Sequence, residues 1–313
     1  MSSTQGRAIV DKLLTDVSNK LVPTGYISEM ILPSIQVKQR SGKIGKYGNN
    51  HLRIVNTVTG GRGSYPMIKT QNRSSTTYHI ESHALKDILV REDYDNVEKP
   101  FDAEKDSVDE LTTMLMTGKE KALADALGDI AVITQNETLA GTDQFSDYVN
   151  SNPNEKFKDA RLAVRGGCGF APNTAIMDWD VAETLRFHPV LLDVLGYKDN
   201  RPGGLNDQEL ARALNVRRVL ISEAVFNDAK EGQADDIKPI WGKDLVFAYI
   251  PERAGLRQQT LGYRLQLSGR KPRQVFKVNQ DEPVDSKKIM VIDDYEQLLV
   301  NVDCAFLYKD AIA

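Results

Sequence analysis

The spacing of apolar residues is clearest in the segment that follows Ser107. Apolar side chains recur there at helical intervals, at Val108, Leu111, Leu115, Ala122, Ala126, Ile130 and Ile133. Residues three and four positions apart lie on one face of a helix. Ser107 with Glu110 also forms the capping-box pattern that opens helices. The pattern therefore predicts one long helix over residues 107–134.

The segments before this helix have shorter patterns. Residues 4–20 place apolar side chains on one stripe, which predicts an amphipathic helix: Ile9, Leu13, Val17 and Leu21. An extended arm follows, in which Pro33 disfavours an interior sheet position. Residues 35–80 contain strand candidates, including "STTYHIESHAL", separated by the turn sequences "GKYGNN" and "TGGRGSYP". They predict a long hairpin-like excursion, and loops of that length are normally functional or docked on another surface.

The second half of the chain alternates between helix and strand patterns. Residues 141–170 are polar and turn-rich, which predicts a connector. After it come the strand "NTAIM", a helix capped by Asp178, a second helix begun at Pro189, and a capped helix over Asn206–Leu214. The remaining apolar runs predict strands: "VRRVLISEAVFN", "DLVFAYIPE", "KKIMVIDDYE" and "LLVNVDCAFLYKDA". The expected fold class is α+β.

Composition adds few constraints. The chain has 313 residues, 41% of them hydrophobic, which is enough for a sizeable core. It contains neither a run long enough to cross a membrane nor an N-terminal apolar signal. The two cysteines, Cys168 and Cys304, are far apart and are expected to be buried free thiols in a reducing compartment. Pairing between them stays open if the fold brings them together.

The charge distribution is more informative. The net charge is −4, yet residues 30–80 contain no acidic side chain and carry Lys38, Arg40, Lys43, Lys46, Arg53, Arg62, Lys69 and Arg73. The following stretch is acidic, with "REDYDN", "EKPFDAEKD" and "VDE". Either block alone is typical of a solvated face, but adjacent blocks of opposite sign favour pairing.

Motifs for catalysis are absent from the sequence. His79 and His83 stand in a strand pattern without a third ligand, and Cys168 has no basic partner nearby. "TGKEKALA" lacks the glycine spacing and the hydroxyl residue of a phosphate loop. Asp178 and Asp180 are explained as a helix cap and first turn. The prediction is no enzyme, with no catalytic, cofactor-binding or metal-binding residue and no cofactor.

Several segments together resemble the major capsid proteins of tailed bacteriophages, which have the Hong Kong 97 phage capsid fold shared with encapsulins. The resemblance is carried by "NTAIMDWDVAETLRFHPVLLDVLGY", by "LNDQELARALNVRRVLISEAVFNDA" with "IWGKDLVFAYIPE", and by "YHIESHALKDILVREDYDN" before the long helix. It covers about residues 30–312. It implies an N-terminal arm (1–34), an extended β-hairpin loop (35–80) and a peripheral domain with the spine helix and connector (81–172). An axial domain (173–270) and C-terminal strands that return to the peripheral domain (271–313) complete it.

The resemblance also implies a function and partners. The chain would self-assemble as pentamers and hexamers into an icosahedral head around double-stranded DNA, contacted non-specifically on the inner surface. A separate scaffolding protein, a portal and decoration proteins would be further partners, with assembly in the host bacterial cytoplasm and no membrane partner. In this family an extended loop lies over the neighbouring subunit, which explains the basic hairpin.

The charge blocks then define two candidate contact sets. The subunit-contact loop comprises Lys38, Arg40, Lys43, Lys46 and Arg53. The acidic partner patch on the adjacent subunit comprises Glu92, Asp93, Asp95, Glu98, Asp102 and Glu104. Two alternatives stay open: an encapsulin-type compartment shell, and a soluble enzyme or nucleic-acid-binding module that uses the basic hairpin to grip phosphates. The few aromatic residues in the loop disfavour a base-stacking platform.

Overall fold

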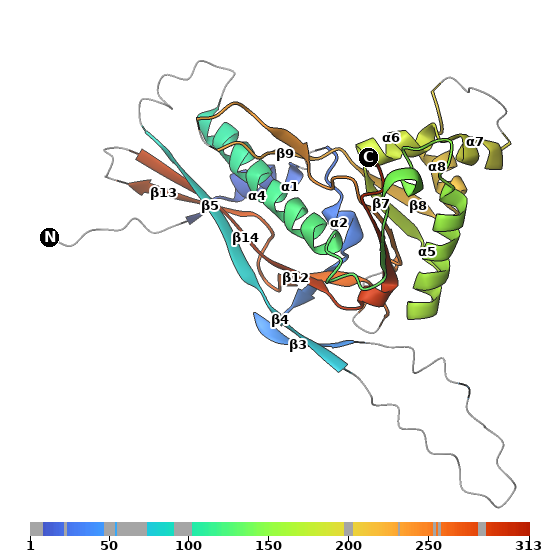
Figure 1. The fold of residues 1–313 in the computed structure, drawn as a ribbon. Helices are drawn as coiled ribbons and strands as arrows, with labels where there is room; N and C mark the ends of the chain where they lie inside the picture. The colour runs from blue at the N-terminus through green and yellow to red at the C-terminus, as the bar shows by residue number, and fades with distance from the viewer. Residues whose placement is uncertain are drawn as a thin grey trace, which may run out of the picture.

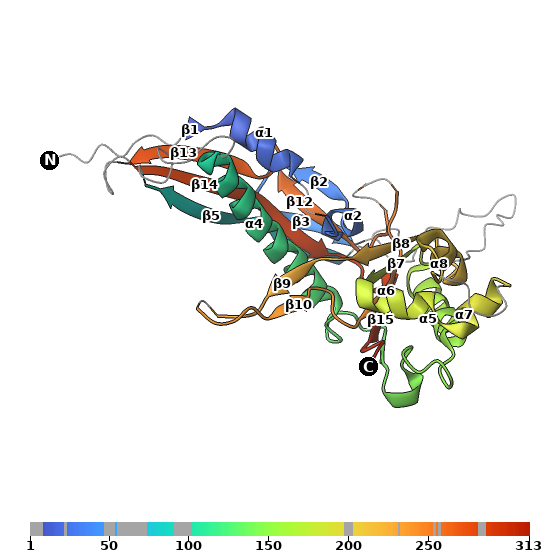
Figure 2. The same ribbon diagram turned by 90° about the horizontal axis from the view of Figure 1, so that it is seen from above.

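The computed structural model describes residues 9–21, 24–46, 54, 74–90, 102–196, 203–230, 232–252, 255, 258–280 and 286–313. An elongated sheet crossed by one long helix makes up one part of the molecule, and a compact sheet among shorter helices makes up the other (Figure 1). Seen from above, the two parts lie end to end (Figure 2). The architecture is mixed α+β, which confirms the predicted fold class.

The elongated sheet has the strand order β1-β13-β14-β12-β2, with β5 along the other edge of β14. Its strands are β1 (Ile9–Val10), β2 (Ser34–Val37), β5 (Glu81–Leu89), β12 (Gly262–Leu267), β13 (Gln274–Gln280) and β14 (Ser286–Leu299). Neighbours are antiparallel except β2 and β12. Pro33 immediately precedes the edge strand β2, as expected for a residue that cannot donate to a sheet ladder.

The long helix α4 (Ala103–Leu127) crosses this sheet and packs beside α1 (Lys12–Lys20). Its first half buries Val108 and Leu111 in a cluster with Leu14, Ile289 and Val291. Its second half buries Leu123, Ala124 and Leu127 in the larger core that extends into the compact part. The short helix α2 (Ser28–Ile31) enters the same larger core. One helix therefore joins both parts of the molecule.

The predicted bounds of the long helix, 107–134, are wrong at both ends. The helix begins at Ala103, and Ser107 lies inside it, where its hydroxyl donates to an Asp87 carboxylate oxygen at 2.8 Å. It ends at Leu127, with Gly128 as the C-cap. The Asp129 side chain then accepts from the Ala131 N–H, which stabilises a turn. The apolar spacing beyond residue 128 therefore belongs to a turn.

The N-terminal helix also differs from the prediction over residues 4–20. Ile9 and Val10 pair with β13, and Asp11 caps a helix that begins only at Lys12 by accepting from two backbone N–H groups. The buried face consists of Leu14, Thr15 and Ser18, while Leu13 is 64% exposed. Strand pairing and the cap set a different start and face from those that apolar spacing indicated.

The compact sheet has the order β6-β15-β11-β7-β8. Its strands are β6 (Asn136–Thr138), β7 (Thr174–Asp178), β8 (Arg218–Ser222), β11 (Leu245–Ala248) and β15 (Ala305–Lys309). Around it lie α5 (Pro153–Cys168), α6 (Trp179–Arg186), α7 (Pro189–Val194) and α8 (Asp207–Ala213), with 3-10 turns at Gly141–Asp143 and Val302–Cys304. Every residue of β7 and β11 is buried, so this sheet is the centre of a core.

Local predictions in the compact part are confirmed. Asp178 accepts from the Asp180 N–H, Pro189 occupies the first turn of α7, and Asn206 forms a capping box with Glu209. The predicted connector over 141–170 is wrong in one respect, because it contains α5. Its buried face repeats at helical spacing: Phe157, Ala160, Val164 and Cys168. Polar residues and two adjacent glycines concealed that face in the sequence.

Two ribbons extend from these sheets. The antiparallel pair β3 (Ser41–Lys46) and β4 (Ser74–His79) points away from the body (Figure 1). Ile44 and Ile80 anchor its base in a cluster with Tyr263 and Leu265. Residues 47–53 and 55–73, the predicted tip, lie outside the described residues. The second ribbon joins β9 (Val225–Asn227) to β10 (Ile237–Pro239).

The predicted domain boundaries stay predictions. One detail differs within the predicted C-terminal segment, 271–313. Its strand β14 lies in the elongated sheet, but β15 pairs with β11 and β6 in the compact sheet. The C-terminal residues are therefore divided between both sheets.

Candidate functional site

The predicted contact loop has exposed lysines at its base. Lys38 and Lys43 are exposed and Lys46 is half-buried, and none of them forms an ion pair within the part of the chain that the structure describes. Lys43 and Lys46 lie on β3, in the antiparallel ladder with β4. Arg53 lies outside the described residues. The base of the arm therefore presents positive charge that its own subunit leaves unmatched among these residues.

Arg40 behaves differently from these lysines. One of its guanidinium nitrogens, Nη2, donates to the Ser82 hydroxyl at 3.0 Å and lies 3.3 Å from a carboxylate oxygen of Asp294. Asp294 also binds Arg270 at 2.5 Å. Burial raises the pKa of Asp294, but Ser82 and the two arginines outweigh it, so the pKa is lowered. Arg40 thus holds the arm against the body.

Only the end of the predicted acidic patch lies within the described residues. Glu92, Asp93, Asp95 and Glu98 are outside them. Asp102 lies 2.8 Å from Lys105. Glu104 binds Lys277 at 2.5 Å and Lys287 at 2.7 Å, and these lysines outweigh burial and lower its pKa. No described loop residue forms an ion pair with Asp102 or Glu104, so the described members of the two sets do not meet within one subunit.

A buried polar centre lies in the second half of α4. The Glu120 carboxylate accepts from the Ile27 N–H at 3.0 Å, the Ser28 N–H at 2.9 Å and the Trp241 indole N–H at 2.8 Å. It therefore ties the N-terminal segment and the Trp-Gly turn to the long helix. Sequence reasoning missed this residue. A charged position three and four residues before Leu123 and Ala124, inside the buried stripe, was the available signal.

The neighbouring Lys119 is also buried. Its ammonium lies 3.3 Å from Glu29 and 3.7 Å from Asp293, and 4.7 Å from the centre of the Tyr295 ring. Burial and the nearby Arg264 lower its pKa, while the two carboxylates oppose that shift. The pKa of Glu29 is lowered, because Arg264 and Lys119 outweigh the effect of burial. These groups form a matched internal cluster.

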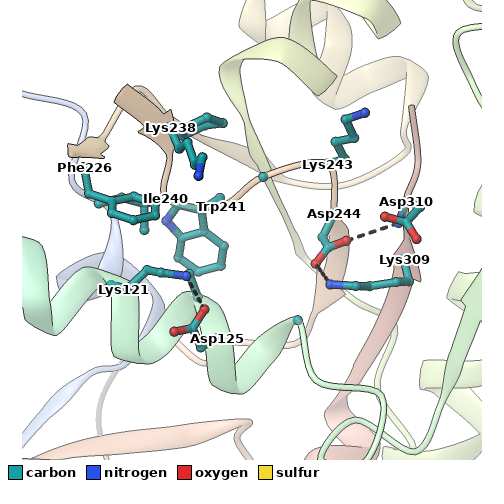
Figure 3. A pocket seen from close by; sticks show the side chains of 14 residues that line it. Lys121, Asp125, Phe226, Lys238, Ile240, Trp241, Lys243, Asp244, Lys309 and Asp310 are labelled. Atoms are coloured by element: carbon teal, nitrogen blue, oxygen red, sulfur yellow. Dashed lines mark hydrogen bonds and ion pairs between the residues drawn. The ribbon is translucent and has the colours of Figure 1, made fainter. Parts of the chain in front are cut away.

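A hollow of about 300 Å³ lies where α4 ends against the β9–β10 ribbon, the loop before β11 and the end of β15 (Figure 3). Its lysines are mostly neutralised: Lys121 binds Asp125 at 2.5 Å, and Lys309 binds Asp244 at 2.7 Å. Burial raises the pKa of Asp244, and Lys309 opposes that shift. None of the residues that line the hollow is a nucleophile next to a base, so the hollow offers no catalytic arrangement.

The histidines have structural contacts. The Nδ1 atom of His188 accepts from the Val190 N–H at 3.3 Å, and its Nε2 lies 3.0 Å from the Ser151 hydroxyl, which confirms the structural role expected for it. His83 stacks on Tyr295. Across the described ranges, no cluster of three or more histidine, cysteine, aspartate or glutamate side chains could hold a metal ion. The expected lack of metal, cofactor and activity stays a prediction.

The cysteines, distant in sequence, meet in one core. Cys168 and Cys304 are free thiols with no exposed surface. The Cys304 thiol hydrogen-bonds to Cys168 and, against the effect of burial, lowers the pKa of Cys168 to about 7, while the pKa of Cys304 is raised. A nucleophile needs access to its substrate. Full burial denies both thiols that access.

Comparisons with known proteins agree on a class. No family model matches the chain. It is 27% identical over 269 residues to the major capsid protein of Burkholderia phage BcepMu, spanning 83% of this chain and 84% of that one. It is 23% identical over 309 residues to the major capsid protein of Pseudomonas phage JBD67, spanning 97% of each.

Solved structures give the fold. A phage-related protein from Bordetella bronchiseptica RB50 matches with a TM-score of 0.75 and 21% identity, over 97% of this chain and 98% of that one. The capsid structure of Cyanophage P-SCSP1u matches with a TM-score of 0.58 and 9% sequence identity, over 99% of this chain and 90% of that one. An encapsulin complex from Synechococcus elongatus PCC 7942 matches with a TM-score of 0.50 and 11% sequence identity, over 97% of this chain and 96% of that one.

The chain therefore has the phage capsid fold. The resemblance to phage major capsid proteins that the sequence indicated is confirmed. Both of these relatives are named as major capsid proteins of phages. Within the described residues, no helix has the length and apolar character to cross a bilayer.

Proposed function

We propose that this chain is the building block of the icosahedral head of a tailed bacteriophage. Its copies assemble as pentamers and hexamers into a closed shell that encloses double-stranded DNA. The observation that carries the proposal is the capsid fold over nearly the whole chain, together with similarity to two phage major capsid proteins. The chain acts as a structural component of the virion and catalyses no reaction.

The β3–β4 arm supports assembly. A two-stranded ladder on the outside of a subunit leaves unpaired edges, which other chains can cover. Among described residues, neither β3 nor β4 pairs with a further strand. The arm also exposes Lys38 and Lys43 without ion pairs among these residues. Such a surface is best satisfied by a neighbouring subunit.

The partner surface we propose for the arm is the acidic patch of the adjacent subunit. The loop side comprises Lys38, Arg40, Lys43, Lys46 and Arg53, and the acidic side comprises Glu92, Asp93, Asp95, Glu98, Asp102 and Glu104. Arg40 and Glu104 already have partners in their own chain, so Lys38, Lys43 and Lys46 are the main donors in this pairing. Electrostatic matching would set register and guide encounter more than it adds affinity.

Other partners follow from the same proposal. A separate scaffolding protein directs shell size, a portal occupies one vertex, and decoration proteins bind outside. Packaged DNA contacts the inner surface without sequence preference. Assembly takes place in the cytoplasm of the host bacterium, before the product becomes part of the virion.

Electron microscopy of the expressed chain, alone and with the other head proteins, tests the proposal. Closed shells with pentamers and hexamers are the expected result. A stable monomer in sedimentation under all of these conditions would overturn it. Shells that hold a protein cargo and no nuclease-protected DNA would instead favour the encapsulin-type alternative, whose fold is shared.

Charge reversal tests the arm. Lys43→Glu with Lys46→Glu is expected to impair assembly and leave the subunit folded, and adding Glu92→Lys with Asp93→Lys is expected to restore part of it. Lys158→Glu with Arg165→Glu, on the exposed face of α5, makes the same change of charge as a control. If the arm variant assembles as well as this control, the loop's charge serves another purpose, and contact with packaged DNA is the next candidate.

A further inference from the structure

A second hollow, of about 480 Å³, lies between α6 and the β9–β10 ribbon. We name it the acidic hollow, and its main lining residues are Asp178, Trp179, Asp180, Glu223, Val225 and Ile237. The parallel strands β7 and β8 end there, at Asp178 and Ser222. The carboxyl ends of β7 and β8 and the first residues of α6 therefore lie at the same hollow.

The acidic hollow has an unmatched negative charge. Asp178 is only 3% exposed, and its Oδ1 atom has no hydrogen-bond partner among the described residues, while its Oδ2 accepts from the Asp180 N–H at 3.3 Å. Asp180 and Glu223 are exposed and have no ion-pair partner within that part of the chain. A buried carboxylate is normally paired or fully hydrogen-bonded. This one is neither.

The rest of the lining is apolar. Trp179 is 45% exposed, and Val225 and Ile237, which lie on adjacent strands of the ribbon, are more than half exposed. Trp241, by contrast, is 6% exposed and hydrogen-bonded to Glu120. Partly exposed tryptophans in a depression are typical of interface anchor sites.

We propose that the acidic hollow binds a lysine or arginine side chain of a second copy of this chain. The aliphatic stem would cover Val225 and Ile237, and the cationic head would meet the Trp179 ring and the carboxylates. The charge of the hollow excludes phosphate groups as occupants. The described surface carries suitable cations without ion pairs, including Arg212 and Lys243. This inference rests on the proposed function, which surrounds each subunit with copies of itself.

Tryptophan quenching tests whether the hollow is covered. The chain has two tryptophans, of which only Trp179 is accessible in the subunit. Acrylamide should quench its emission in free subunits and severalfold less in shells made from this chain alone. A Trp179→Phe variant identifies the component that belongs to this residue. Equal quenching in subunits and shells overturns the inference while the proposed function stands, and failure to form any shell, even with the other head proteins present, overturns both.

Charge neutralisation tests the nature of the occupant. Asp180→Asn with Glu223→Gln is expected to raise the protein concentration needed for assembly about tenfold, the scale of one desolvated cation contact. Glu155→Gln with Asp159→Asn, on the exposed face of α5, is the matched control and should leave the protein concentration needed for assembly unchanged. Circular dichroism of the subunits checks that each variant is folded. If Trp179 is shielded but the hollow variant matches the control, the occupant is apolar and the cation site is excluded.

Discussion

Two sets of lysines in this molecule lie in opposite surroundings. Lys119, in the second half of α4, is 3% exposed, and its ammonium lies near carboxylate oxygens of both Glu29 and Asp293. Lys38 and Lys43, on and beside the β3 strand, are exposed and have no ion pair among the described residues. Inside the subunit, the buried ammonium of Lys119 is matched by two nearby carboxylates. On the arm, positive charge accumulates without a described match.

This difference indicates which lysines affect the stability of the folded subunit and which do not. Removing one partner of a buried pair leaves the other charge desolvated, which typically costs 3–5 kcal/mol, whereas an exposed pair contributes about 0–1 kcal/mol. Loss of one member of the internal cluster should therefore destabilise the subunit. The arm's lysines contribute little to the folded monomer, which leaves them available for contacts between subunits.

The largest expected effect comes from removing the Glu120 carboxylate. Glu120→Ala leaves the Ile27, Ser28 and Trp241 N–H groups without their acceptor in a buried site. At about 1–3 kcal/mol for each of the three unsatisfied groups, the free energy of unfolding should fall by about 3–9 kcal/mol in urea titrations of the subunit. Glu110→Ala, at an exposed position of the same helix, is the control and should change it by less than about 0.5 kcal/mol. Equal midpoints for the two variants would contradict the role of Glu120.

The next effect compares the two kinds of lysine through one substitution. Lys119→Met leaves Glu29 and Asp293 near each other without their shared cation, and should lower the free energy of unfolding by about 3–4 kcal/mol. Lys43→Met should leave it almost unchanged and alter only the salt dependence of assembly. Thermal unfolding of both subunits measures the contrast. A Lys119→Met subunit as stable as the Lys43→Met subunit would remove the basis of the comparison.

The pKa of a buried carboxylate without a nearby cation should shift upward, in the opposite direction from that of Glu29. Burial raises the pKa of Asp178 to about 6, and the neighbouring Asp180 charge adds to this. The folded state then retains a proton that the unfolded state releases near pH 4, so Asp178 lowers stability as pH rises from about 4 to 6. Asp178→Asn keeps the helix cap and should stabilise the free subunit at pH 7 by at most about 3 kcal/mol, with little change at pH 3.5. Denaturant midpoints at both pH values check this, and a variant that is less stable at pH 7 would show that the charged form is favoured.

The smallest effect per contact concerns the arm. Exposed ion pairs are screened over about 8 Å at physiological ionic strength and over about 3 Å at 1 M salt. Shell assembly should therefore weaken as salt rises, while the free energy of unfolding of the subunit stays nearly constant. Light scattering and urea titration over the same salt series separate the two. Assembly that is insensitive to salt would rule out the arm's lysines as the main electrostatic contacts.

Sequence patterns predicted those elements whose signals lie within a few residues. Asp178, Pro189 and Asn206 each mark a helix start through local hydrogen bonding or a fixed backbone angle, and each was predicted correctly. The β3–β4 pairing was similarly indicated by turn residues and β-branched strands. The charge asymmetry of the arm is also a property of the sequence alone.

Features that depend on distant residues were not predictable in this way. The end of α4, the buried face of α1 and the presence of α5 depend on what packs against each segment. Glu120 and Trp241 are more than a hundred residues apart, and nothing local links them. The acidic hollow was missed for the same reason, since Asp178 was explained by its cap and its unpaired oxygen becomes visible only in three dimensions.

The positions of β14 and β15 also affect biosynthesis. β14 lies between β5 and the strands β12 and β13 of the elongated sheet, and β15 lies between β6 and β11 of the compact one, although both strands come last in the chain. At about 5–20 residues per second, a ribosome needs roughly 15–60 s to reach them. Until then the elongated sheet lacks β14, the strand with which β5, β12 and β13 pair, and the compact sheet lacks β15, the strand that joins β6 to β11. Neither sheet can therefore be completed before residues 286–309 have been synthesised.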